Sequence, residues 1–358
     1  MIEELDVPKT HDSIDGVPEP SASDYLTGHD EIAAFLAQAY HEGRMHHALL
    51  FEGEQGIGKA TLAFHLAGHM LAHGDPVLAP ETIQSPDFTK PLWRQIAGGM
   101  HPAVLHINRP FDQKTGKFKT GIPIEEIRRV THFLTRTASD GAWRIVIIDP
   151  ADDMNRNAAN ALLKTLEEPP ARAIFIMISH SSGRLLPTIR SRCQSIQFKP
   201  LTDKALSDAL IHIGPKIGLD ADNITPALLF RSEGSVRKAL LLVAHGGLEI
   251  SDTVDSILQG KTFDLPKAQA LSNVLNGREA ETQYELFRDY LLSRIADEAR
   301  RYADSGQTRE ADQWSRYWSE LSREITNAET YNLDRKQAVM ILLQKTYRAF
   351  GSGVPPLA

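Results

Sequence analysis

The chain has 358 residues, 42% of them hydrophobic, and this length predicts two or three domains rather than one core. Its single cysteine, Cys193, excludes both a disulfide framework and a four-cysteine zinc site. The net charge of −7, from 39 basic and 46 acidic residues, argues against a protein that wraps nucleic acid alone, because such proteins usually present a basic surface.

Both ends of the chain are predicted to be disordered. Residues 1–24 carry seven acidic residues against one lysine, and such a stretch buries too little apolar surface to offset its ordering entropy. Residues 351–358 form a flexible tail of similar character. No apolar run approaches the roughly 18 residues of a membrane span, and the acidic start does not resemble a signal peptide. We therefore expect a cytoplasmic protein with no membrane partner.

Residues 25–200 alternate between apolar runs and helical patterns. Five runs rich in β-branched residues predict strands buried on both faces, over 47–53, 103–108, 143–149, 173–179 and 193–198. Helices are predicted between them, over 60–72, 124–134 and 157–168. This alternation predicts an α/β domain with a parallel sheet. The proline-rich segment 71–100 is interpreted as an irregular insertion.

The strands cease after Pro200. Helical patterns over 201–214 and 225–246 predict a small helical lid domain over 201–262, in which Thr225 caps a helix that opens with Pro226. An all-helical domain is predicted over 263–350. Its core would be built from two stripes at helical spacing: Tyr284, Phe287, Leu291 and Ile295, and Trp314, Tyr317, Trp318, Leu321 and Ile325.

The stretch GEQGIGKAT, residues 53–61, resembles a phosphate-binding loop, and it lies between a predicted strand and a predicted helix. Its backbone N–H groups would cradle phosphate, and Lys59 would reach the outer phosphates. Ala60 stands where a serine or threonine would bind magnesium, and Thr61 is rotated by about 100° around the helix, away from the site. The predicted nucleotide-binding residues of the loop are Gly53, Gly56, Gly58, Lys59, Ala60 and Thr61.

A second acidic motif, IVIIDPAD, places Asp149 at the end of a predicted strand, where it could partner magnesium. The next residue, Pro150, replaces the glutamate that would orient an attacking water. Asp152 and Asp153 are interpreted as solvated loop acids. Because two hydrolytic parts are absent while Lys59 remains, we expect a degenerate site that holds ATP or ADP without hydrolysis and contains no metal ligand set.

Four stretches resemble the AAA+ ATPase-fold subunits of bacterial DNA polymerase III clamp loaders: HHALLFEGEQGIGKAT, NALLKTLEEPP (160–170), LLPTIRSRCQSIQF (185–198) and SEGSVRKAL (232–240). The resemblance covers about 25–350. Ala60 and Pro150 favour the delta-prime class, which typically does not hydrolyse ATP. The alternative is an active ATPase motor subunit of the gamma/tau class.

The resemblance implies an AAA+ P-loop parallel sheet, a helical lid and a C-terminal helical collar that joins the subunits. Arg192 matches the arginine finger that reaches across an interface to a neighbour's ATP. Ser179 matches the first sensor position, and Arg237 matches the second sensor, which contacts phosphate in the chain's own site. Family members often carry a four-cysteine zinc module where this chain has the cysteine-free segment 71–100, so no zinc is expected.

The implied function is that of a non-hydrolysing stator. It would complete the subunit ring and donate Arg192 to a neighbouring ATPase subunit while the sliding clamp is loaded on DNA. The implied partners are the delta and gamma/tau subunits, and the clamp and primer-template DNA through the assembled complex. The chain would then be part of the DNA polymerase III holoenzyme without ATPase or polymerase activity of its own.

Overall fold

The computed structural model describes residues 10–135, 142–181, 183–277 and 280–355. Contacts between residues divide the chain into two compact units, with the division between Lys238 and Ala239. None of the helices within these described ranges is long and apolar enough to cross a membrane.

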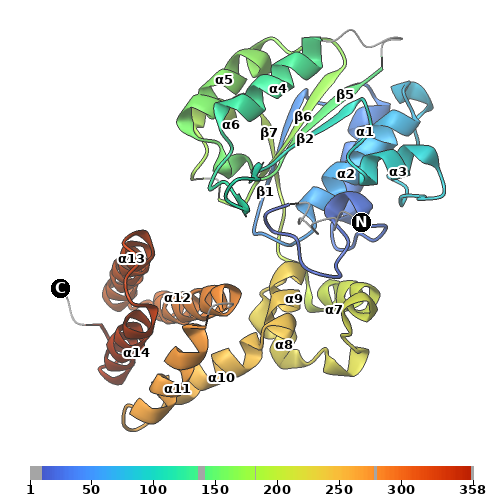
Figure 1. Ribbon diagram of the computed structural model, residues 1–358. Helices are drawn as coiled ribbons and strands as arrows, with labels where there is room; N and C mark the ends of the chain where they lie inside the picture. Colours follow the sequence, from blue (N-terminus) through green and yellow to red (C-terminus); the bar gives the residue numbers. More distant parts are fainter. Residues whose placement is uncertain (1–9, 136–141, 182, 278–279, 356–358) are drawn as a thin grey trace. The chain divides into compact units, whose positions relative to one another are not determined.

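A five-stranded parallel sheet forms the centre of the first unit (Figure 1). Its strands lie in the order β2 (Val104–Ile107), β5 (Arg144–Ile148), β6 (Ala173–Ser179), β1 (Ala48–Glu52) and β7 (Gln194–Gln197). The five predicted strands are therefore confirmed. Every residue of β1 and β6 is buried, which explains why their sequences are apolar throughout rather than alternating.

Helices cover both faces of this sheet (Figure 1). One face carries α1 (Asp30–His41), α2 (Lys59–Ala72) and α3 (Pro91–Ala97), and the other carries α4 (Ile124–Thr135), α5 (Arg156–Glu167) and α6 (Pro187–Arg190). Leu49 and Phe51 belong to the first core cluster and Leu50 to the second, because successive strand side chains point to opposite faces. The predicted α/β architecture is confirmed.

Residues 10–24 are ordered, so the prediction of a disordered tail over 1–24 is wrong for them, and residues 1–9 lie outside the described part. The short helix η1 (Pro20–Ala22) contacts α2 and α3. Ser21 Oγ donates to the carbonyl of Ala97 at 3.3 Å, and the carbonyl of Ser23 lies 2.8 Å from Nε2 of His65. These contacts with α2 and α3 hold the segment in place, although its own composition predicts disorder.

The segment 71–100 was predicted to be irregular, but it contains η2 (Pro76–Leu78) and the helix α3. Trp93 of α3 is buried against Gly68 of α2, where an added Cβ would come within 2.0 Å of the indole ring. A glycine within helix α2 therefore provides the space into which α3 docks. Between β2 and α4 the chain also forms a hairpin of β3 (Phe111–Asp112) and β4 (Lys117–Phe118).

The helices after the sheet are α7 (Asp203–Ile213), η5 (Gly214–Ile217), η6 (Ala221–Asn223), α8 (Pro226–Ser232) and α9 (Val236–Ala244). The predicted cap is present, since Thr225 Oγ1 accepts from the Leu228 N–H at 3.2 Å. The single helix predicted over 225–246 is instead two helices, because Glu233 and Gly234 both have positive φ angles, 50° and 76°.

The second unit is helical: α10 (Gly247–Leu258), α11 (Leu265–Leu275), α12 (Glu281–Asp304), α13 (Thr308–Thr330) and α14 (Arg335–Gly351). Its core contains both predicted stripes except for Trp318, which is 39% exposed. Helix α10 contributes Ile250, Val254 and Ile257 to this core. The sequence analysis had assigned these residues to the lid domain predicted over 201–262. Near the C-terminus, Tyr302 Oη donates to the carbonyl of Gly353 at 2.7 Å, and residues 356–358 lie outside the described part.

The two tryptophans of α13 give a test of this core. Trp314 is 1% exposed and packs edge-on against Phe350 with ring centroids 5.1 Å apart. We expect Trp314→Ala to lower the free energy of unfolding by about 3–5 kcal/mol. Trp318→Ala is the matched control and should cost far less. Urea titration of both variants measures this, and equal losses would contradict the packing described.

Candidate functional site

The predicted phosphate-binding loop connects β1 to α2, and left-handed glycines shape it. Gly56 and Gly58 have φ angles of 78° and 100°, which residues with a side chain rarely adopt. Lys59 is 2% exposed, and its ammonium donates to the carbonyl of Gly53 at 2.7 Å and to that of Glu54. Burial lowers the pKa of Lys59 to about 8, against the opposing charges of nearby carboxylates. The Lys59 ammonium is therefore hydrogen-bonded to carbonyl groups of the loop itself.

Asp149 follows β5 directly and lies close enough to Lys59 for the two charges to interact, as the paired motifs predict. Burial raises the pKa of Asp149 to about 7; the charge of Asp12 adds to this effect and that of Lys59 opposes it. Ala60 packs against the core cluster beneath α2. Neither Ala60 nor Pro150 has a side-chain oxygen, so the site lacks an oxygen ligand at one position and a carboxylate base at the other.

Asp152 is not a solvated loop acid, which corrects the sequence interpretation. Its carboxylate accepts from Ser179 Oγ at 2.7 Å and from the N–H groups of His180 at 2.5 Å and Ser181 at 3.0 Å. Asp153 forms an ion pair with Arg109. The hydroxyl at the predicted first sensor position is thus bonded to Asp152, which also holds the backbone that follows β6.

Arg237 lies beside the loop, as its predicted sensor position requires. The carbonyl of Gly56 accepts from the Val236 N–H at 3.0 Å, and Ser235 Oγ donates to the carbonyl of Gln55 at 2.8 Å. A Cβ on Gly56 would come within 2.3 Å of Arg237 Cβ, so this approach needs the glycine. The Arg237 guanidinium donates to the carbonyl of Asp12, a residue that the sequence analysis did not connect with the site.

Arg192 lies at the opposite edge of the sheet from the loop. It precedes β7, in which Gln194 pairs with Leu49 near the start of β1, whereas the loop follows the end of β1 at Glu52. Five residues at about 3.3 Å each separate the two edges by about 16 Å. The structure therefore groups Lys59, Asp149, Ser179 and Arg237, and places Arg192 elsewhere.

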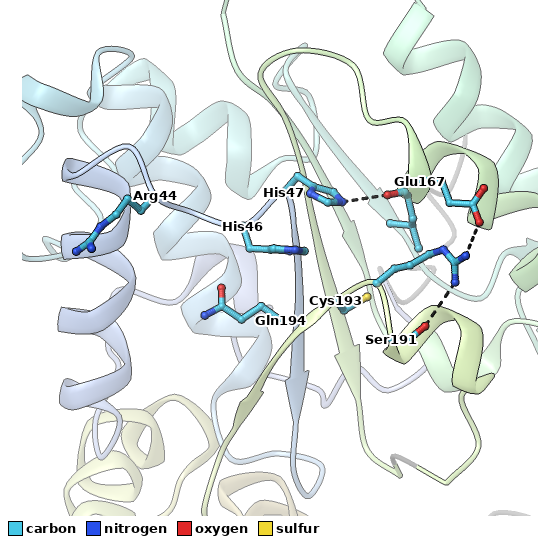
Figure 2. A pocket seen from close by; sticks show the side chains of 9 residues that line it. Arg44, His46, His47, Glu167, Ser191, Cys193 and Gln194 are labelled. Carbon is cyan, nitrogen blue, oxygen red and sulfur yellow. Dashed lines mark hydrogen bonds and ion pairs between the residues drawn. The ribbon is translucent and has the colours of Figure 1, made fainter.

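Arg192 lines a cavity of about 800 Å³, together with the basic Arg44 and the acidic Glu167 (Figure 2). The Arg192 guanidinium donates to Glu167 Oε1 at 2.5 Å and to the carbonyl of Thr188 at 2.8 Å. His47 lines the same cavity, with Nε2 3.0 Å from the carbonyl of Leu166. These contacts give Arg192 a defined position at a solvent-accessible face.

Comparison with known proteins finds similarity to subunits of DNA polymerase III. A family model described as "DNA polymerase III, delta subunit" matches residues 28–202. The delta-prime subunit of Pseudomonas aeruginosa is 37% identical over 161 residues, 45% of each chain, and that of Bacillus subtilis is 33% identical over 182 residues, 50% of each. Gamma and tau subunits also match. The chain is thus similar to the delta-prime, gamma and tau subunits of DNA polymerase III.

The match spans about half the length of these two curated relatives. Among solved structures, a DNA polymerase III gamma subunit-related protein from Thermotoga maritima is 16% identical, with a TM-score of 0.46 over 90% of this chain and 100% of that one. The sheet order and the helices of the chain itself define its fold. The family model includes Lys59, Asp149, Ser179 and Arg192, whereas Arg237 lies beyond it.

The raised pKa of Asp149 predicts a pH-dependent stability. Between the ordinary carboxyl value of 3.8 and about 7, the unfolded chain has lost this proton while the folded chain keeps it, so the carboxyl lowers stability as pH rises. Each pKa unit corresponds to about 1.4 kcal/mol. Calorimetry should show Asp149→Asn gaining stability over wild type from pH 5 to pH 8, with the exposed Asp15→Asn as control. A constant difference would contradict the burial of Asp149.

Proposed function

We propose that the chain is a non-hydrolysing stator subunit of the clamp loader, acting through Arg192 on the ATP of a neighbouring subunit. The observation that carries this proposal is the position of Arg192 at the opposite edge of the sheet from the chain's own phosphate loop. A guanidinium about a strand length away from Lys59 has no route to a nucleotide on its own loop. This separation supports a role in trans.

The chemistry of a trans arginine suits this arrangement. A guanidinium meets phosphate oxygens with a planar fork of N–H donors and stays charged at any physiological pH. In related NTPases such an arginine accelerates phosphoryl transfer by roughly 10³–10⁵. Glu167, which accepts from Arg192, would keep the side chain extended over the cavity until the neighbour's γ-phosphate competes for it. The partners in this proposal are the delta and gamma/tau subunits, the sliding clamp and primer-template DNA.

The chain's own site would contribute no hydrolysis. Magnesium has no hydroxyl ligand at Ala60, and Pro150 cannot activate water. ATP or ADP bound at Lys59 would therefore remain intact, with zinc and other resident metals absent. The second candidate is an active gamma/tau-like motor, which the grouping of Lys59, Asp149 and Arg237 in one site favours.

Turnover by the isolated chain separates the two candidates. We expect the purified chain to release no phosphate above the level of its own Lys59→Ala variant. Ala60 and Pro150 lack the groups that would bind the metal and activate the attacking water. A steady-state phosphate-release assay with saturating ATP and magnesium measures this. Turnover that disappears in Lys59→Ala would favour the motor and contradict the stator.

Substitution of Arg192 tests the trans role. Arg192→Ala and Arg192→Lys should leave thermal stability and complex assembly nearly unchanged, since the side chain lies at an exposed face. Both should lower ATP turnover by complexes of this chain with its own delta and gamma/tau subunits, by tenfold or more at the adjoining site. Lysine should not restore it, because it lacks the planar fork.

Arg184→Ala is the matched control, an exposed arginine in the turn that precedes α6. It should leave turnover unchanged. Size-exclusion chromatography of each complex verifies equal assembly before turnover is compared. Equal turnover by the wild-type and Arg192→Ala complexes would make Arg192 an ordinary surface cation.

A further inference from the structure

The N-terminal segment lies against the phosphate loop rather than away from the fold. Residues 10–19 form a compact turn: the Thr10 N–H donates to Ser13 Oγ at 3.0 Å, and Thr10 Oγ1 donates to Glu19 Oε2 at 3.2 Å. The chain then continues through η1, which contacts α2 and α3. At its far end, Asp24 pairs with His212 at 3.1 Å, and the Tyr25 and His212 rings stack with centroids 4.4 Å apart. The segment is therefore anchored along its length.

Asp12 is the residue of this segment that enters the candidate nucleotide site. Gln55, within the loop, donates from Nε2 to Asp12 Oδ2 at 3.2 Å. Arg237, at the second sensor position, donates to the carbonyl of the same residue. The carboxylate is also near enough to Asp149 to raise the pKa of that residue. One acidic residue thus contacts the loop and the sensor helix at once.

These are contacts of the kind that a nucleotide phosphate would make. A phosphate at this loop would accept from loop donors and from the Arg237 guanidinium, and it would bring negative charge near Lys59. In this chain, the Asp12 carboxylate accepts from Gln55, the Asp12 backbone carbonyl accepts from Arg237, and the negative charge of Asp12 lies near the Arg237 guanidinium. Lys59 has its own partners in the Gly53 and Glu54 carbonyls. Lys59 and Arg237 therefore both donate hydrogen bonds to carbonyl groups of the chain itself.

We propose that residues 10–24 are an intramolecular ligand of the degenerate nucleotide site, with Asp12 in place of a phosphate group. A nucleoside triphosphate must displace this turn and break the Gln55 and Arg237 contacts before it can bind the loop. The observed association constant is then the intrinsic association constant of the loop multiplied by the fraction of molecules in which the segment is displaced. This proposal concerns the chain alone and does not depend on the role of Arg192.

Nucleotide binding by full-length variants tests it. Fluorescence titration with a fluorescent ATP analogue, without magnesium, should give at least tenfold tighter binding for Asp12→Ala than for wild type. Asp12→Asn, which keeps the shape and removes the charge, should fall between them. Asp15→Ala is the matched control, an exposed acid in the same segment, and should bind as wild type does.

Two further measurements make the test decisive. Lys59→Ala in the Asp12→Ala background should abolish the gain, since the gain arises at the loop. Hydrogen exchange of the wild-type chain should show residues 10–24 losing protection when nucleotide is added at saturation. Equal binding by wild type and Asp12→Ala, including no binding by either, would overturn the proposal, as would a gain that persists without Lys59. Thermal unfolding of each variant verifies that the fold is intact.

Discussion

Parallel pairing of β1 with both β6 and β7 is the constraint on which both candidate sites depend. Because parallel strands run in the same direction, the loop after β1 and Ser179 at the end of β6 lie at one edge of the sheet. The same pairing places the residues before β7, including Arg192, at the other edge. Every residue of β1 and β6 is buried, so a shift in the register of this pair would expose apolar groups and is costly.

The loop edge is stabilised in a closed form by its own polar groups. Gly56 permits the start of α9 to approach within hydrogen-bonding distance, and Asp152 fixes the backbone after β6. Buried charge is tolerated only where it is paired and hydrogen-bonded. Lys59 meets that requirement through two loop carbonyls, which gives this lysine a structural role without nucleotide. Its presence therefore does not by itself imply ATP chemistry.

The two edges consequently carry different sets of polar groups. At the loop edge, the hydroxyl ligand and the base of an ordinary ATPase are absent at Ala60 and Pro150, and Asp12 contributes the anionic oxygens. At the other edge, the charged and partly exposed guanidinium of Arg192 donates to Glu167. Within the chain, the helical second unit has its own core, built around Trp314 and Phe287.

The sequence by itself determined the local features of the chain. Five apolar runs predicted the five strands. The reason holds for β1 and β6, which are buried throughout and need apolar residues at every position, whereas β2 and β7 are only partly buried, contrary to the prediction. Gly58 and Lys59 marked the loop because few other structures need both. The exposed Trp318, the helix α3 and the ordered residues 10–24 were decided by tertiary structure. Helical spacing cannot tell a core position from its neighbour, and η1 is ordered by the surfaces of α2 and α3 rather than by its own composition. The same reason applies to Asp12 and Asp152: each is an ordinary acid in the sequence, and only the partners that folding brings from distant positions make either one part of the site.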